Sequence, residues 1–287
     1  MENKINRKPK WLQKKINPNL DKELLDLFKK QNINTVCTEA MCPNITECFS
    51  KKQATFLIMG NNCTRQCTFC AVTKDTPIPL DKNEPHNISK TVKLLGLKHV
   101  VITSPTRDDL SDGGAEYFYQ TVNSIKKLNN DTTVELLIPD MKGDIKALEK
   151  IASSKAAIIG HNIETVPRLY RIRKGANYQR SLKVIEHLKE LNTPKLLKSG
   201  LMLGLGEKDS EVIDVMKDLI DSGCRLLSIG QYLAPTLEHE KVVEFVKPEK
   251  FEYFKEQAYK LGFDHIESSP YTRSSYMAHE YLNSYKG

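Results

Sequence analysis

The sequence predicts an α/β protein in which about six parallel βα units form a partial, open barrel. Continuous apolar runs recur from residue 55 onward, and segments with the apolar spacing of helices separate them. Apolar runs that alternate with helices in this way are typical of buried parallel strands. The chain has 287 residues, 39% of them hydrophobic, which is enough for one large domain with a substantial core. Six successive βα units favour an open barrel over a flat sheet.

Three regions are expected: an N-terminal extension over residues 1–50, the barrel over residues 51–267, and a C-terminal tail over residues 268–287. The extension holds one helix, Leu20 to Lys30, with an acidic first turn. The tail has no clear period and is free to fold back over the barrel. The predicted strands are Thr55–Met59, Val100–Thr103, Val134–Pro139, Ala156–Ile159, Leu196–Leu205 and Leu226–Tyr232.

The charge of the chain is concentrated at its start. Six Lys and Arg residues and one Glu within residues 1–15 account for +5 of the net charge of +7. Nucleic-acid binding needs several cations that converge on one surface. Because the remaining residues are nearly neutral, we expect no nucleic-acid partner, and we interpret the basic arm as solvated or as a docking segment.

The sequence has no run of about 18 apolar residues, so no membrane span is expected. The N-terminus also lacks the apolar stretch of a secretory signal. We therefore expect a cytoplasmic protein whose cysteines stay reduced and serve metals rather than disulfides.

Six of the seven cysteines lie within 34 residues as two triplets. The second triplet, Cys63, Cys67 and Cys70, has the spacing C-x3-C-x2-C and directly follows the first predicted strand. Three thiolates can hold three irons of a [4Fe–4S] cube and leave the fourth iron open for a substrate. A structural zinc site is the alternative, but zinc prefers four ligands in closely spaced pairs.

The first triplet, Cys37, Cys42 and Cys48, also needs a fourth ligand if it holds a cube. A cluster that only relays electrons would normally have four cysteine ligands. Cys224 is the one remaining cysteine, and we expect it to be a small buried residue rather than the fourth ligand. The tail segment Arg273-Ser274-Ser275-Tyr276 offers a hydroxyl, which is a weak ligand for iron. A weak ligand suits a cube that must release an iron when its sulfur is donated. A polar tail or a helix cap is the structural alternative for the two serines.

Further polar segments follow the predicted strands. Asp112-Gly113-Gly114-Ala115 would allow close backbone approach to a ligand. His161-Asn162-Ile163-Glu164-Thr165 could bind sugar hydroxyls through Asn162 and Glu164, or form structural hydrogen bonds. Four arginines could clamp a carboxylate, although solvated helix charges are the default; they are Arg168, Arg171, Arg173 and Arg180.

Taken together, these residues resemble the lipoyl synthase family of radical S-adenosylmethionine (SAM) enzymes, over nearly the whole chain. The C-x4-C-x5-C triplet just before the second cysteine loop, with Arg-Ser-Ser-Tyr near the end, is highly specific for that family. The other matching segments are Lys8-Pro-Lys-Trp-Leu12, Asp112-Gly-Gly-Ala115, His161-Asn-Ile-Glu-Thr-Val-Pro-Arg-Leu-Tyr170 and Gly230-Gln-Tyr-Leu233.

The resemblance implies a radical SAM fold and two [4Fe–4S] clusters. Cys63, Cys67 and Cys70 would hold the cluster that binds SAM, with Phe69 beside the adenine. Cys37, Cys42, Cys48 and Ser275 would ligate the auxiliary cluster, Ser274 being the less suitable serine. The SAM-positioning residues implied are Gly113, Gly114, Asn162 and Glu164.

The implied reaction inserts two sulfur atoms, at C6 and C8, into an octanoyl chain on a lysine of a lipoyl carrier domain. A low-potential ferredoxin or flavodoxin would supply electrons, a deoxyadenosyl radical from SAM would abstract hydrogen, and the auxiliary cluster would donate sulfur. The chain is expected to be a monomer. The alternative functions are a different sulfur-inserting or methylthio-transferring radical SAM enzyme and a non-enzymatic two-cluster electron carrier.

The sequence departs from the family pattern at three places. Pro105-Thr106 stands where Val-Asp is usual, Gly160 stands where Asn is usual, and Met277 replaces a common His. These positions lie near the presumed mouth of the barrel, and none of them is a predicted cluster ligand.

Overall fold

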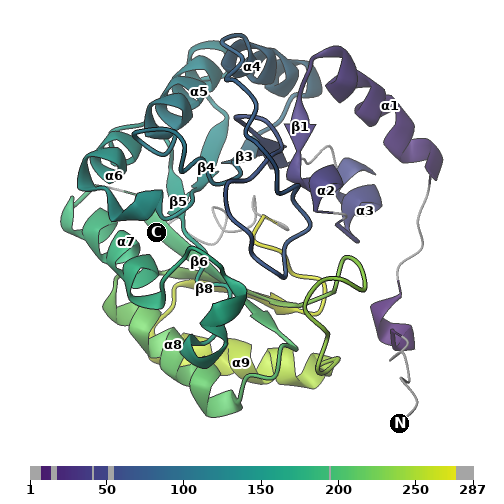
Figure 1. Cartoon of the computed structure of the whole chain (residues 1–287), viewed down its shortest axis with the longest axis vertical. Helices are drawn as coiled ribbons and strands as arrows, with labels where there is room; N and C mark the ends of the chain where they lie inside the picture. The colour runs from purple at the N-terminus through teal and green to yellow at the C-terminus, as the bar shows by residue number, and fades with distance from the viewer. Residues whose placement is uncertain (1–7, 14–17, 41, 51–54, 194, 276–287) are drawn as a thin grey trace.

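The computed structural model describes residues 8–13, 18–40, 42–50, 55–193 and 195–275. Eight strands form one sheet in the order β1 to β8 along the chain. Strands β2 to β8 are all parallel, and the short β1 pairs antiparallel with β2. The two end strands, β1 and β8, do not pair with each other, so the sheet is curved but open (Figure 1). The prediction of an open, mostly parallel α/β barrel is confirmed.

The six predicted strands all form. They are β2 (Thr55–Leu57), β3 (His99–Thr103), β4 (Thr133–Leu137), β5 (Ile158–Gly160), β6 (Leu196–Leu203) and β7 (Leu226–Gln231).

Two strands were not predicted: β1 (Asn34–Thr35) and β8 (His265–Ser269). Strand β8 is the seventh parallel strand, and it crosses the expected boundary between barrel and tail at residues 267 and 268. Its sequence, His-Ile-Glu-Ser-Ser, has only one apolar residue, because an edge strand is buried less completely than a central one.

Helices run around the outside of the strands (Figure 1). The predicted N-terminal helix is confirmed within α1 (Pro18–Lys30). The remaining helices are α2 (Val36–Glu39), α3 (Ile45–Ser50), α4 (Glu84–Leu95), α5 (Ala115–Leu128), α6 (Ile145–Ala152), α7 (Tyr178–Glu190), α8 (Asp209–Asp221) and α9 (Pro248–Leu261), with short 3-10 helices at Lys10–Leu12, Met141–Gly143 and Pro167–Ile172.

The large hydrophobic core lies between the helices and the sheet. Fully buried side chains from both layers meet there, among them Phe56 of β2, Phe118 of α5 and Phe251 of α9. A smaller, separate cluster forms from Val101, Ile158 and Leu226. Because alternate strand residues point to opposite faces, this cluster belongs to the inner face of the barrel.

No helix in the described part of the chain has the length and apolar character to cross a membrane. The parallel strands all end at the same rim, and the loops that follow them build the site described next.

Candidate active site at the rim of the barrel

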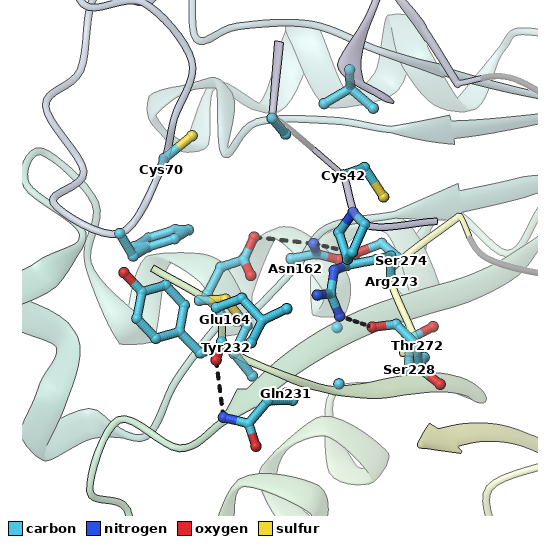
Figure 2. Close-up of a pocket in the computed structure, with 18 of the residues that line it drawn as sticks. Cys42, Cys70, Asn162, Glu164, Ser228, Gln231, Tyr232, Thr272, Arg273 and Ser274 are labelled. Atoms are coloured by element: carbon cyan, nitrogen blue, oxygen red, sulfur yellow. Dashed lines mark hydrogen bonds between the residues drawn. The ribbon is translucent and has the colours of Figure 1, made fainter. Parts of the chain in front are cut away.

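A cavity of about 370 Å³ lies at the carboxyl ends of the strands. Four separate parts of the chain line it: the N-terminal segment, the Cys63 loop, the ends of β4 to β7, and the C-terminal segment (Figure 2). Of the predicted site residues, the cavity brings together Cys37, Cys42, Phe69, Cys70, Asn162, Glu164, Ser274 and Ser275. Cys48, Cys63, Cys67, Gly113 and Gly114 are not among its lining residues.

The Cys63 loop is held by backbone hydrogen bonds at several points. The amide of Cys63 donates to the Thr73 carbonyl at 2.8 Å, and the amide of Thr68 donates to the Ile172 carbonyl at 2.9 Å. The pKa of the Cys70 thiol is raised to about 12, mainly by burial, and the neighbouring Cys67 and Cys63 act in the same direction.

In the Cys37 triplet, Cys37 lies in α2, Cys48 lies in α3, and Cys42 lies between the two helices. Burial raises the pKa of the Cys37 thiol to about 12, and Cys42 and Cys48 contribute in the same direction. The amide of Cys42 donates to the Cys37 carbonyl at 3.0 Å, which closes the turn between α2 and α3.

The donor set of each triplet fits a cubane cluster. All seven cysteines are free thiols. Within the described ranges, no three His, Cys, Asp or Glu side chains converge as they would around a single metal ion. A cube does not require such convergence, because each thiolate binds a different iron.

The C-terminal segment folds back over the cavity, as Figure 2 shows for Thr272, Arg273 and Ser274. Gly230 of β7 makes this path possible, since a Cβ atom at this position would lie 2.0 Å from the Thr272 carbonyl oxygen. Asn44 fastens the segment to the N-terminal part of the chain by donating to the Tyr271 carbonyl at 2.7 Å.

The two serines of this segment have different partners. Asn162 Nδ2 donates to Ser274 Oγ at 2.7 Å. Thr55 Oγ1 donates to Ser275 Oγ at 2.6 Å. The backbone amide of Thr55 also hydrogen-bonds the Cys37 sulfur and favours its thiolate. Ser275 is therefore connected through one residue to the Cys37 triplet, whereas Ser274 is connected to the Asn162 side.

Asn162 and Glu164 form a polar wall of the cavity (Figure 2). Asn162 Nδ2 donates to Glu164 Oε1 at 3.0 Å. Burial raises the pKa of Glu164, and the Arg173 guanidinium acts in the opposite direction. Arg173 Nη1 donates to the Asn162 carbonyl at 3.0 Å. Its buried Nε has no partner among the described residues, so Arg173 has capacity for another acceptor.

The remaining predicted residues lie elsewhere. Gly113 and Gly114 directly precede α5, and Cβ atoms there would lie 2.8 Å and 2.4 Å from the sulfurs of Met141 and Met59. His161 is buried behind the cavity, with Nδ1 2.9 Å from the Ile138 carbonyl and Nε2 3.0 Å from Ser181 Oγ. The expectation that Cys224 is buried is confirmed.

The other arginines of the predicted set do not meet at the cavity. Arg168 pairs with Glu211, and Arg180 pairs with Asp140.

Sequence reasoning missed a contact between the β7–α9 loop, residues 232–247, and the Cys63 loop. His239 Nε2 donates to the Cys70 carbonyl at 3.1 Å, and the Glu240 amide donates to the Thr68 carbonyl at 3.1 Å. Thr68 Oγ1 in turn donates to Glu240 Oε1 at 2.6 Å. These residues are about 170 positions apart, and no local pattern indicates the contact.

The chain is similar to known proteins in both sequence and fold. A family profile described as the Radical SAM superfamily matches residues 57–219. A lipoyl synthase of Geobacter sp. (strain M21) is 55% identical over 96% of this chain and 95% of its own length. Lipoyl synthases of Geobacter metallireducens and Caldicellulosiruptor saccharolyticus are 56% and 51% identical, over 96% of this chain and 98% and 97% of their own lengths.

Solved structures show the same fold at low identity. The crystal structure of methylornithine synthase (PylB) superposes with a TM-score of 0.57 at 14% identity, covering 89% of this chain and 79% of that chain. Streptococcus suis SuiB bound to S-adenosylmethionine gives 0.56 at 13% identity, covering 76% and 50%. These likenesses concern the fold alone. The near full-length sequence identities go further: the chain belongs to the lipoyl synthase family of the radical SAM superfamily.

Proposed function

We propose that this chain inserts two sulfur atoms, at C6 and C8, into an octanoyl group carried on a lysine of a lipoyl carrier domain. The observation that carries the proposal is the meeting of three chain segments at one cavity. Members of both cysteine triplets and the Ser274-Ser275 pair line the same space. A sulfur donor and a radical generator must both reach one substrate chain, and a shared cavity allows this.

In this proposal Cys63, Cys67 and Cys70 hold the cluster that binds SAM. The auxiliary cluster is held by Cys37, Cys42, Cys48 and Ser275. When bound, the first cluster supplies the electron that cleaves SAM and the second supplies the sulfur atoms. The contacts of Thr55 support Ser275 as the fourth ligand. The Thr55 hydroxyl donates to the Ser275 oxygen, and the Thr55 amide contacts Cys37 of the same triplet.

Other side chains position SAM and the substrate in this proposal. Phe69 lies beside the adenine, and Asn162 and Glu164 accept or donate at sugar hydroxyls. A role for Gly113 and Gly114 in binding the SAM ammonium group stays a prediction. One wall of the cavity is suited to an apolar acyl chain. It is formed by Met202, Tyr232, Leu233, Ala234 and Pro235.

We also propose the partners and the setting. The substrate is an octanoylated carrier domain, the electron donor is a low-potential ferredoxin or flavodoxin, and the chain works as a monomer in the cytoplasm. No nucleic-acid partner is proposed, because the charge outside the basic arm is nearly balanced.

Mass spectrometry of an octanoyl-lysyl peptide tests the function. Anaerobic protein reconstituted with iron and sulfide is incubated with SAM and dithionite. We expect a gain of two sulfurs with loss of hydrogens, together with 5′-deoxyadenosine. Deoxyadenosine with an unchanged peptide would reject the substrate. A methylthio product would favour the methylthiolating alternative, and neither product in protein that holds both clusters would favour the electron carrier.

A pair of serine variants tests the ligand assignment. In a background where Cys63, Cys67 and Cys70 are all alanine, only the auxiliary cluster is loaded. We expect Ser275→Ala to change the EPR spectrum of that reduced cluster and Ser274→Ala to leave it unchanged. In the full enzyme, Ser275→Ala should slow product formation by about tenfold or more. Equal spectra for the two variants would refute the role of Ser275.

A further inference from the structure

Arg65 lies inside the Cys63 loop, between Cys63 and Cys67, and its side chain is only 6% exposed. Its guanidinium makes two bidentate contacts. Nε and Nη2 donate to the Asp108 carboxylate at 2.8 and 3.1 Å, and Nη1 and Nη2 donate to the Asp140 carboxylate at 2.9 and 2.6 Å. Bidentate contacts of this kind fix a guanidinium in both position and plane.

Both carboxylates are themselves anchored to the barrel. Asp108 follows β3, and its amide donates to Thr64 Oγ1 at 3.1 Å. Asp140 follows β4, accepts from the Lys142 amide at 3.1 Å, and receives a further hydrogen bond from Arg180 Nε at 2.8 Å. Two neighbouring strand ends therefore hold one side chain of the loop.

The backbone beside Arg65 is packed just as closely. A Cβ atom at Gly175 would lie 3.3 Å from Arg65 Cδ, so the glycine allows the chain to cover the arginine stem. The Thr64 amide donates to the Thr106 carbonyl at 3.0 Å. The side chain of Arg65 and the amide of the preceding residue, Thr64, are thus both held in place.

The amide of Arg65 donates to the sulfur of Cys63, at an N to Sγ distance of 3.4 Å. A hydrogen bond to a ligating sulfur stabilises the reduced cluster, because the added electron increases the charge on the sulfurs. The Arg65 side chain leaves the same residue as this amide and is fixed at its far end by Asp108 and Asp140.

We infer that Arg65 is a positioning residue: its contacts with Asp108 and Asp140 hold the Arg65 amide against the Cys63 sulfur and so raise the reduction potential of the cluster on that loop. This inference rests on the proposed assignment of Cys63 as a cluster ligand. It is specific to the electron-accepting step and does not concern the acyl substrate.

The test uses protein in which Cys37, Cys42 and Cys48 are alanine, so that only one cluster titrates. Redox titration followed by EPR compares the parent with Arg65→Gln and Arg65→Lys. Arg65→Gln removes both the charge and the bidentate guanidinium. Arg65→Lys keeps the charge and removes the bidentate geometry. Arg168→Gln is the control, because Arg168 makes an equally bidentate but exposed pair with Glu211, at 2.7 and 2.8 Å.

We expect the potential to shift to more negative values in Arg65→Gln, to shift in the same direction by less in Arg65→Lys, and to stay unchanged in Arg168→Gln. Iron content and thermal unfolding of the apoprotein are measured in parallel. A fully loaded Arg65→Lys protein with the parent potential would overturn the inference. So would loss of the cluster or of the fold in Arg65→Lys, since Arg65 would then build the site rather than set its potential.

The ligand assignment is checked separately with Cys63→Ala in the same background. If that variant keeps the EPR signal and iron content of the parent, the proposed assignment fails. If it loses the cluster while the Arg65 variants titrate normally, only the inference about Arg65 fails.

Discussion

Thr55 shows how much a single residue at the start of β2 contributes to this site. Its amide contacts the Cys37 sulfur and its hydroxyl contacts Ser275, 220 positions further along the chain. Threonine suits the position because it is β-branched, which favours a strand, and also carries a hydroxyl donor. Neither function of Thr55 can be recognised from its neighbours in the sequence.

The burial of His161 predicts that the stability of the protein depends on pH. Burial and the nearby Arg173 lower the pKa of His161 to about 4, although Asp140 and the Ile138 carbonyl act in the opposite direction. The folded state therefore binds the proton more weakly than the unfolded state. The neutral ring therefore makes its full contribution to the free energy of unfolding above the unfolded-state pKa of about 6.5. This contribution falls as the pH decreases toward the folded-state pKa.

We expect His161 to reduce the free energy of unfolding of the apoprotein by about 2 kcal/mol between pH 7 and pH 5. Urea unfolding of the parent and of His161→Gln at both values measures this. The stability difference between the two proteins should change by that amount, and parallel pH profiles would contradict the prediction.

The β7–α9 loop is the element that carries the most unexpected contact. Thr236 Oγ1 lies 2.8 Å from His239 Nδ1, which leaves Nε2 as the donor to the Cys70 carbonyl. The loop thus contacts the carbonyls of the two residues next to Phe69, Thr68 and Cys70, and Phe69 and Tyr232 line the same cavity. A parallel barrel brings the loops after distant strands to one rim, so this contact follows from topology.

Removing this contact should loosen the Cys63 loop. In the apoprotein we expect His239→Ala to speed amide exchange at residues 68 to 70 by about fivefold, the equivalent of one hydrogen bond of about 1 kcal/mol. Leu237→Ala is the matched control, since Leu237 lies in the same loop and is 89% exposed. Equal exchange in the two variants would show that the loop is held by other contacts.

At the scale of the whole molecule, a buried ion pair crosses the interior of the barrel. Lys198 Nζ of β6 lies 2.9 Å from Glu135 Oε1 of β4, and both side chains are almost fully buried. Strand β5 separates the two strands in the sheet, so the pair spans the inner face. Glu135 has a lowered pKa because Lys198 and His99 offset its burial.

Breaking this pair should destabilise the whole barrel. We expect Lys198→Met to lower the free energy of unfolding by about 3 to 5 kcal/mol, because it leaves the buried Glu135 carboxylate without its lysine partner. The double variant Lys198→Met/Glu135→Leu should regain most of that loss, since neither charge remains. Denaturant unfolding of the three apoproteins measures both effects, and a double variant no more stable than Lys198→Met would disprove the explanation.

Local sequence patterns were sufficient to predict most of the parallel strands and one cysteine loop. Apolar runs of four or more residues located six of the seven parallel strands, and the close spacing of Cys63, Cys67 and Cys70 identified a candidate cluster loop. Strand β8 was missed because a half-buried edge strand needs few apolar residues. Spacing could also suggest a serine ligand in the tail, but it could not distinguish the partners of Ser274 from those of Ser275.

The contacts between residues that are distant in the sequence became apparent from the three-dimensional arrangement of the strands and loops. It placed the hydroxyl of Thr55 on Ser275, the carboxylates of Asp108 and Asp140 on Arg65, and His239 on the Cys70 carbonyl. The contacts of Arg65 and His239 join loops that follow different strands. The contact of Thr55 joins strand β2 to the C-terminal segment. Local sequence records the preference of a segment for helix, strand or turn, whereas the curvature and order of the parallel strands determine which segment ends lie together.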